Sequence, residues 1–198
     1  MPKLSEAARS ARRQDLVDAA WRCIARKGWR DLTVDDVCAE AGVSKGAFYG
    51  YFTRKQELLA ALAEDEADQL DALLDQLRSR PLEAAEQLRR YARAILERAT
   101  DPARVQVRAD LWAAMSTKPD VRERLAATVA RRRAGLRELV EAGVATGQLQ
   151  AVPANALASI LLALTDGLVL HRGLDPTAFR WANVYRALDA LLEGVRRG

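Results

Sequence analysis

The chain has 198 residues, 49% hydrophobic and 29% charged, which supplies enough apolar side chains for a substantial core and excludes a disordered protein. Its six prolines and eleven glycines fall mostly at segment ends, while Ala, Leu, Arg, Glu and Gln fill the segments between them. This bias favours helices and leaves little for strands, so we expect an all-α fold.

The net charge of +4 lies entirely in the N-terminal quarter. Residues 1–56 carry eleven Lys or Arg against seven Asp or Glu, an excess of four, whereas residues 57–198 carry twenty of each. A local basic excess is expected of a region that binds a polyanion such as DNA. Four charges are a small excess, so chance alone explains this feature equally well.

The first two predicted helices come early in the chain. Apolar residues recur with helical spacing from Leu16 to Ile24, and the pattern stops at Gly28, a natural C-terminal cap. Thr33 then stands where an N-cap is needed for a helix over 34–41. We therefore expect one long helix followed by one of about two turns.

The next two predicted helices complete a recognisable motif. Gly42 ends the second helix, Ser44 caps a short one that reaches about Tyr51, and Thr53 caps a long one over 54–78. Two short helices joined through a glycine turn indicate a helix-turn-helix.

Prolines punctuate the remaining sequence, and each precedes a helical pattern, as expected of a first-turn residue. The predicted helices there span 82–99, 102–116, 119–146, 154–172 and 177–196. The expected total is nine helices.

The last two predicted helices are too apolar for the surface of a monomer. Paired with the same helices of a second copy, they would form the four-helix interface of a two-fold homodimer. Its candidate residues are Leu161, Leu168, Val184, Leu188, Leu191 and Val195. The alternative is that the preceding helices cover both sides of this pair.

Enzyme chemistry finds little support in the sequence. The chain has one histidine, His171, and no GxSxG elbow, phosphate-binding loop or metal-ligand cluster, so we expect no catalysis, cofactor or metal. Cys23 and Cys38 lie in apolar helical patterns, which indicates buried thiols in a cytoplasmic protein, with redox sensing as the alternative. The N-terminus lacks the apolar core of a signal peptide, and the longest uncharged run, 152–165, is shorter than a membrane span.

The stretch GVSKGAFYGYF, residues 42–52, has the composition of a recognition helix for the DNA major groove. Small residues at its start allow close approach, and Lys45 supplies a donor. Phe48 and Phe52 are four residues apart and share an inward face, whereas Tyr49 and Tyr51 point elsewhere and can donate to phosphates. The alternative is that all four aromatic side chains belong to the core.

The segment LTVDDVCAEAGVSKGAFYGYFTRKQEL, from Leu32 to Leu58, resembles TTVDDIAxxAGVSKGTLYxYFxSKEEL, the approximate pattern of the TetR family of transcriptional regulators. The preceding LVDAAWRCIARKGW resembles the family's first helix, and the later LLALTDGLVLHRGLDP resembles one common type of its C-terminal domain. The resemblance is specific over about residues 10–60 and looser beyond them.

The resemblance implies a nine-helix TetR-like architecture, with a three-helix helix-turn-helix head at 1–56 and a helical effector-binding and dimerisation domain at 57–198. It also implies a repressor that binds a palindromic DNA operator as a homodimer and is released by an unknown small-molecule effector. The alternative is an architectural or nucleoid-associated protein that binds DNA without an effector. The positions that match the family's DNA contacts are Thr33, Val43, Ser44, Lys45, Gly46, Ala47, Tyr49, Tyr51 and Lys55.

Two departures from the family pattern stand out. Gly50 replaces a larger side chain, and Val34 replaces a frequent second threonine, so each removes one potential contact with DNA. Arginines 9, 12 and 13 precede the expected first helix, where they form either a flexible arm that reaches DNA or a solvated terminus.

The effector pocket is expected between the fifth and eighth helices. Candidate lining residues by helical position are Tyr91, Trp112, Met115, Leu136, Leu164 and His171, with a core role as the alternative for Trp112 and Met115. Asp166 needs a donor or a partner charge if it is buried, and we favour a structural or interface role for it. The three arginines at 131–133 span nearly a full turn and indicate a solvated face.

Overall fold

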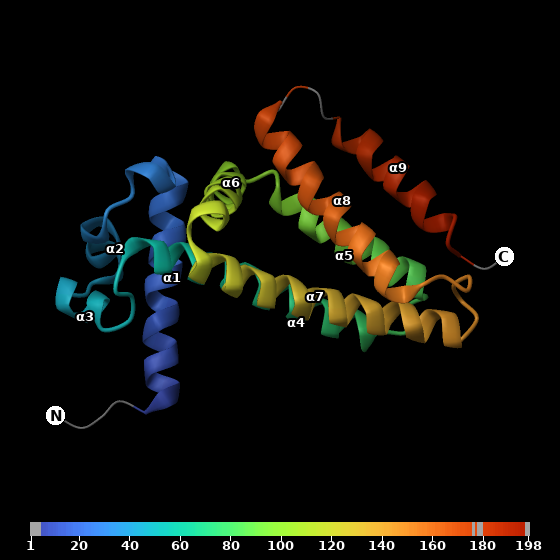
Figure 1. Cartoon of the computed structure of the whole chain (residues 1–198), viewed down its shortest axis with the longest axis horizontal. Coiled ribbons are helices and arrows are strands. Elements are labelled where there is room, and N and C mark those ends of the chain that lie inside the picture. Colours follow the sequence, from blue (N-terminus) through green and yellow to red (C-terminus); the bar gives the residue numbers. More distant parts are fainter. Residues whose placement is uncertain (1–4, 176, 178–179, 197–198) are drawn as a thin grey trace.

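The computed structural model describes residues 5–175, 177 and 180–196, and Figure 1 shows the arrangement of its helices. The described residues form nine α-helices and no named strand, which confirms the predicted all-α fold. The helices are α1 (Glu6–Asp31), α2 (Val34–Ala41), α3 (Lys45–Tyr49), α4 (Lys55–Arg78), α5 (Ala84–Arg98), α6 (Pro102–Thr117), α7 (Pro119–Ala145), α8 (Ala154–Leu174) and α9 (Trp181–Glu193).

Helix α1 begins ten residues before its apolar pattern does. The Ser5 hydroxyl caps it by accepting a hydrogen bond from the Ala8 N–H, 3.2 Å away. Arg9, Arg12 and Arg13 are therefore helical, and the alternative of a flexible arm is wrong for them. The apolar pattern located only the part of the helix that is buried, because polar helical turns leave no hydrophobic signal.

The predicted stop at Gly28 is confirmed as a break in α1. Gly28 has φ +81° and ψ 165°, outside the helical region, and one short turn follows it before Leu32. A Cβ atom at this position would lie 2.7 Å from Oε1 of Gln106 on α6. The positive backbone angle therefore favours glycine here, and a side chain would also have to push the end of Gln106 aside.

Other boundaries differ by a few residues. Helix α4 begins at Lys55 with Arg54 at the N-cap position, so the predicted cap at Thr53 is wrong: its N–H and its hydroxyl both donate to the Glu57 carboxylate, and its hydroxyl caps no backbone N–H. The last helix was expected from 177 but begins at Trp181, while 176, 178 and 179 lie outside the described residues.

The buried side chains form two apolar clusters. The head cluster joins α1, α2 and α3 to the first turns of α4 and to parts of α6 and α7. The body cluster joins the rest of α4 to α5, α7, α8 and α9. Helix α4 contributes to both, with Leu58 and Leu62 in the head cluster and Leu70 and Leu74 in the body cluster.

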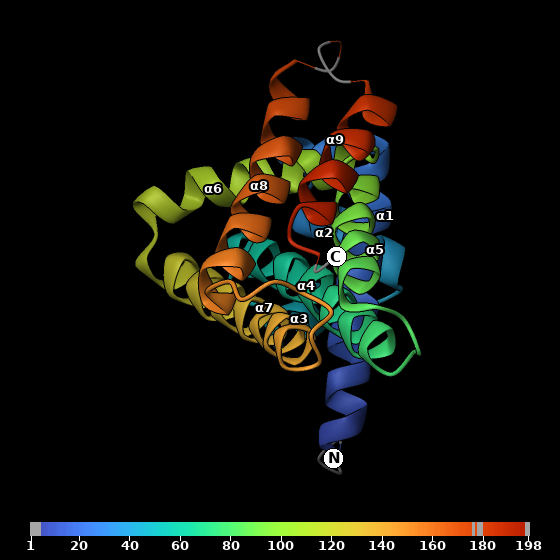
Figure 2. The ribbon, with the colours of Figure 1, turned by 90° about the vertical axis from the view of Figure 1, so that its right-hand side faces the viewer.

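Helix α6 lies between the head and the body (Figure 1). It contacts α1, α4, α7 and α8. Figure 2 views the molecule from the end of the body and shows α8 and α9 in its upper part, above α4 and α7. Helix α9 packs on α5. A movement of α6 would therefore change contacts in both the head and the body.

Helix α8 is longer and more apolar than its uncharged run suggested. Over Ala154–Leu174 it has a window of mean hydropathy 1.5, of which 28% is buried within the protomer. By length and composition alone it could cross a membrane, a test that core helices of soluble proteins also pass. The helix is longer than the uncharged run at 152–165 because it continues through Asp166 and Arg172, and its low burial leaves an apolar face uncovered within the protomer.

Candidate functional sites

The turn into α2 is held by reciprocal hydrogen bonds. The Thr33 hydroxyl accepts from the Asp36 N–H (3.2 Å), and Asp36 Oδ2 accepts from the Thr33 N–H (2.8 Å), which together form a capping box. Hydrogen bonds from Lys27 and then from Thr33 hold the pKa of Asp36 well below its usual range. Gly42 ends α2 in the left-handed conformation, at φ +65°.

Helix α3 ends at Tyr49, two residues before the predicted end, and it and the turn after it separate their aromatic side chains into buried and exposed ones. Phe48 and Phe52 are fully buried in the head cluster with ring centroids 5.4 Å apart, whereas Tyr49 is 51% exposed. Tyr51 is intermediate, because part of its ring packs against the head cluster. The interpretation that all four aromatics are core is wrong for Tyr49.

The N-terminal half of α3 forms an exposed surface. The Ser44 hydroxyl accepts from the Ala47 N–H at 3.2 Å, and Ser44, Lys45, Gly46 and Ala47 are all exposed. Val43 is half-buried against the head cluster. Lys45 Nζ lies 2.8 Å from Asp35 Oδ1 in an exposed ion pair, which water and any incoming anion can open.

Lys55 contacts the end of α1 and not the exposed surface of α3. Its ammonium group donates to the carbonyl oxygens of Trp29 (2.7 Å) and Arg30 (3.3 Å) and lies over the Trp29 ring. Burial lowers the pKa of Lys55 below its usual value. In this conformation it ties α4 to the end of α1.

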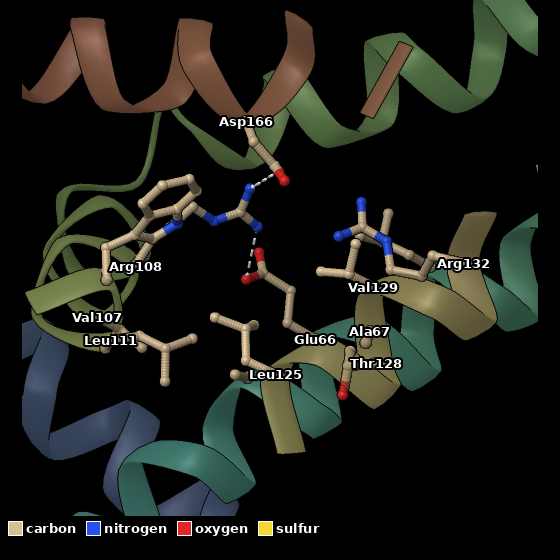
Figure 3. A pocket seen from close by; sticks show the side chains of 13 residues that line it. Glu66, Ala67, Val107, Arg108, Leu111, Leu125, Thr128, Val129, Arg132 and Asp166 are labelled. Atoms are coloured by element: carbon tan, nitrogen blue, oxygen red, sulfur yellow. Dashed lines mark hydrogen bonds and ion pairs between the residues drawn. The ribbon is translucent and has the colours of Figure 1, made fainter. Parts of the chain in front are cut away.

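A cavity of about 60 Å³ lies between α4, α6, α7 and α8. Figure 3 shows charged side chains from all four helices that point into it. Arg108 on α6 donates to Glu66 Oε2 on α4 (3.1 Å) and to Asp166 Oδ1 on α8 (2.7 Å). Arg104 Nη1 lies 3.5 Å from the second oxygen of Glu66.

Glu66 is only 6% exposed. Burial by itself would raise the pKa of its carboxyl group, but the guanidinium groups of Arg108 and Arg104 outweigh burial and lower it. The carboxylate is thus kept ionised inside the protein. The partner that Asp166 requires is Arg108, 58 positions earlier in the chain.

A second, open groove of about 680 Å³ lies between α6 and the C-terminal end of α8. Its walls are mostly apolar, with Val105 and Gln106 on α6 and Leu170 and His171 on α8 among them. His171 is exposed, as its position at the end of an apolar helix indicates.

The structure does not gather the six predicted pocket residues into one site. Trp112 lines the cavity and His171 lines the groove. Tyr91 and Leu136 are buried in the body cluster, and neither Leu164 nor Met115 lines either space. Helical position placed these residues in the body, but it could not tell a core side chain from one at a cavity wall.

The polar residues of the cavity were mostly missed. Glu66, Arg108 and Arg132 were not candidates, and the solvated face expected at 131–133 is wrong for Arg132, which is 6% exposed. The isolated carboxylate of Asp166 within an apolar helix was the one signal in the sequence that pointed here.

Both cysteines are free and buried, as expected. Burial raises the pKa of the thiols of Cys23 and Cys38, which lowers their thiolate content and their reactivity. Within the described part of the chain, no group of three or more His, Cys, Asp or Glu side chains is arranged to hold a metal ion.

Two family models match the chain. One, described as "Bacterial regulatory proteins, tetR family", matches residues 16–62, and the other, "BetI-type transcriptional repressor, C-terminal", matches residues 84–197, more than half of the chain. The chain belongs to the TetR family. The transcriptional regulators of this family are not enzymes in general. The first match extends beyond residue 56, into the turns of α4 that pack in the head cluster.

Individual relatives agree with this TetR-family assignment. The HTH-type transcriptional regulator BetI of Escherichia coli is 41% identical over 88 residues, an alignment that covers 44% of this chain and 44% of that relative. A transcriptional regulator from Saccharomonospora viridis, solved in complex with choline, superposes with a TM-score of 0.76 at 21% identity, over 96% of this chain and 100% of that one. A TetR-family regulator from Pectobacterium atrosepticum has the same TM-score at 24% identity, over 98% of both chains.

The TetR-family head is linked to the body through α6. The Trp29 N–H donates to Oε1 of Gln106 at 3.2 Å, next to the break at Gly28. Two positions further along α6, Arg108 faces the cavity. One helix therefore touches the first helix of the head with one face and the charged cavity with another.

The predicted dimer residues fall into two groups. Leu161 and Leu188 are buried within the protomer, whereas Leu168, Val184 and Val195 are half-buried and Leu191 is 61% exposed. Ile160, which was not among the candidates, is 60% exposed. An uncovered apolar face thus remains on α8 and α9, but its members differ in part from the predicted set.

Proposed function

We propose that this TetR-family protein is a cytoplasmic repressor that binds a palindromic operator as a homodimer and is released when a small molecule binds in its body. The observation that carries the proposal is the surface of α3. Phe48 and Phe52 fix the helix to the head cluster, while Ser44, Lys45 and Tyr49 face solvent on one short, capped helix. A buried anchor and an exposed polar surface are what a recognition helix needs in the major groove.

The proposed DNA contacts follow from exposure. The Lys45 ammonium group would leave Asp35 and bind a base edge or a phosphate of the DNA. Gly46 and Ala47 permit close approach, and the Tyr49 hydroxyl donates a hydrogen bond to the DNA backbone. Thr33 contributes from the start of α2, where its hydroxyl is exposed although it takes part in the capping box.

The remaining candidates have weaker positions. Val43 and Tyr51 are half-buried beside this surface, and Lys55 reaches a phosphate only after leaving the carbonyls of Trp29 and Arg30. We therefore assign them supporting contacts and place the main affinity on α3.

The proposed dimer uses the uncovered face of α8 and α9. Ile160, Leu168, Val184, Leu191 and Val195 supply apolar side chains that a second copy would bury, each with a favourable transfer free energy. Leu161 and Leu188 would support this face from within the protomer. We place the functional boundary between the head and the effector-binding and dimerisation domain inside α4, after Leu62, in place of the division at 56 and 57.

Release would act through α6. Two recognition helices must fit successive major grooves about 34 to 36 Å apart, so a ligand that favours another separation of the heads lowers operator affinity. The coupling that such a ligand supplies is typically 1 to 3 kcal/mol. Gln106 and Arg108 place α6 in contact with both the head and the cavity, which supports this route.

The test is selection of bound sequences from random duplex DNA by the full-length chain. We expect one palindromic sequence, with binding lost in a Lys45→Ala/Tyr49→Ala double variant and kept in an Arg131→Ala control, an exposed body residue paired with Asp68 and Asp71. Binding at many unrelated sequences, unaffected by any compound, would instead favour the architectural protein.

A further inference from the structure

We infer that the cavity between α4, α6, α7 and α8 binds a small carboxylate, whose charge pairs with the guanidinium of Arg132 and whose apolar part lies against Leu111, Leu125 and Val129. The inference rests on the proposed function and deepens it, because it names the chemical class of the effector.

Arg132 is the group that needs a partner. It is 6% exposed, its Nε lies 3.4 Å from the Tyr91 hydroxyl, and its buried Nη2 has no hydrogen-bond partner within the part of the chain that the structure describes. Figure 3 shows its guanidinium pointing into the cavity, toward the side where Asp166 and Glu66 meet Arg108. An arginine stays charged in proteins, so a full positive charge is buried here with an unused donor.

Each carboxylate of the cavity is paired with an arginine. Glu66 and Asp166 both accept hydrogen bonds from Arg108, and Arg104 approaches the other oxygen of Glu66. Glu66 Oε1 has no hydrogen-bond partner among the described residues. Three arginines (Arg104, Arg108 and Arg132) nevertheless face only two carboxylates here, and this excess of positive charge favours an anionic ligand. Quaternary ammonium sites also use several aromatic faces, whereas Trp112 is the one aromatic side chain among the described residues that line this cavity.

Size and shape restrict the ligand further. A volume of about 60 Å³ holds several water molecules but lies well below the roughly 300 to 1,000 Å³ of sites for drug-sized ligands. A carboxylate fits the fork of a guanidinium with two parallel hydrogen bonds. Branched aliphatic side chains of α6 and α7 on the cavity wall leave an apolar surface for a short hydrocarbon tail.

A ligand bound at Arg132 would also affect the contacts between the body and the head. A carboxylate at Arg132 brings a third negative charge near Arg108, the arginine that joins α6 to both α4 and α8. Arg108 can then redistribute its hydrogen bonds, and α6 carries the change to Gln106 and Trp29.

The experiment uses the full-length chain with sodium acetate, butyrate and benzoate as probes, and with butyramide and choline chloride as comparison compounds at equal ionic strength. Calorimetric titration and thermal unfolding should show binding of at least one acid, with a raised melting temperature, and no binding of the amide or of choline. Arg132→Met should weaken the binding of that acid about tenfold or more, since a charged hydrogen-bond partner is lost.

Two further variants keep the result interpretable. Arg131→Met is the matched control, because Arg131 lies next to Arg132 on α7 but is exposed and paired with Asp68 and Asp71, so it should leave binding unchanged. Arg132→Lys keeps the charge and should retain part of the affinity. Without ligand, Arg132→Met should unfold at a higher temperature than the parent chain, because an unpaired buried charge is replaced by an apolar side chain.

The inference is overturned if choline binds and the acids do not, if butyramide binds as well as butyrate, if none of the three acids binds, or if Arg132→Met binds an acid normally. Operator selection without any ligand, done on the same preparation, separates this outcome from failure of the proposed function. A chain that selects a palindrome but ignores acids loses only the inference, and one that binds acids but selects no DNA loses only the proposed function.

Discussion

The head and the body differ in the kinds of side chain that they bury. The buried side chains of the head cluster are all apolar, and its charged groups lie at exposed or half-buried positions. The five buried polar side chains among the described residues, Glu66, Gln87, Thr128, Arg132 and Thr165, lie in the body from α4 onward. An apolar core gives one rigid shape, whereas buried charges are stable only in a particular pairing. Packing in the head therefore depends on shape alone, whereas packing in the body also depends on which charges meet.

The largest expected effect tests the buried charges of the body. Arg108→Met leaves Glu66 and Asp166 without their shared partner and should lower the free energy of unfolding by about 3 to 5 kcal/mol. Urea denaturation measures the change. The triple variant Glu66→Gln/Arg108→Met/Asp166→Asn should recover part of the loss, because no unpaired carboxylate remains. A single variant as stable as the parent chain would mean that these charges are already hydrated.

The apolar core of the head gives the next effect. Phe48→Ala removes a fully buried ring and should cost about 3 to 5 kcal/mol of stability, near the lower end if α3 collapses onto the space. Tyr49→Ala, its exposed neighbour, is the control and should leave the urea midpoint nearly unchanged while operator binding falls. Equal destabilisation by both substitutions would contradict the division of α3 into an anchor and a contact surface.

A smaller effect tests the link between the two regions. Gln106→Ala removes the acceptor of the Trp29 N–H and should lower stability by about 1 kcal/mol. It should also reduce the effect of ligand on operator affinity, measured by fluorescence anisotropy with and without ligand, while affinity for the ligand itself stays the same. Unchanged coupling would show that another route, such as the ion pair of Arg54 with Asp120, carries the signal.

The smallest effect concerns the surface charge of the head. Lys45→Ala should weaken operator binding and reduce the slope of log affinity against log salt by about one, since one phosphate contact is lost. Lys27→Ala is a useful control, because Lys27 is held by Asp36 at the end of α1. A slope unchanged by Lys45→Ala would indicate that this lysine reads a base or stays with Asp35.

Local signals in the sequence were sufficient for much of the head. Thr33, Gly42 and Ser44 act within three or four residues of their own positions, as caps or turn residues, so their roles could be predicted without neighbours. The four-residue spacing of Phe48 and Phe52 likewise identified the buried side of the segment formed by α3 and the turn after it. The predicted range of α2, 34–41, agrees with the structure at both ends.

The body was harder to predict because its important contacts join distant residues. Arg108 meets Asp166 across 58 positions and Glu66 across 42, and no local pattern encodes these distances. Helical periodicity could place Leu161 and Leu188 on apolar faces, but it could not say whether the protomer or a partner covers them. For the same reason it assigned Tyr91 and Leu136 to a pocket when they lie in the core.

By itself the sequence determined the helix class and most of the helices, with caps such as Thr33 and Ser44, because helix formation depends on hydrogen bonds and side-chain spacing within a few residues. Only the tertiary structure decided that Arg132, one of three adjacent arginines, is buried with an unused donor while Arg131 remains at the surface. The physical reason is that the burial of a charge depends on which helices pack around it, and that packing is settled by side chains far away in the chain.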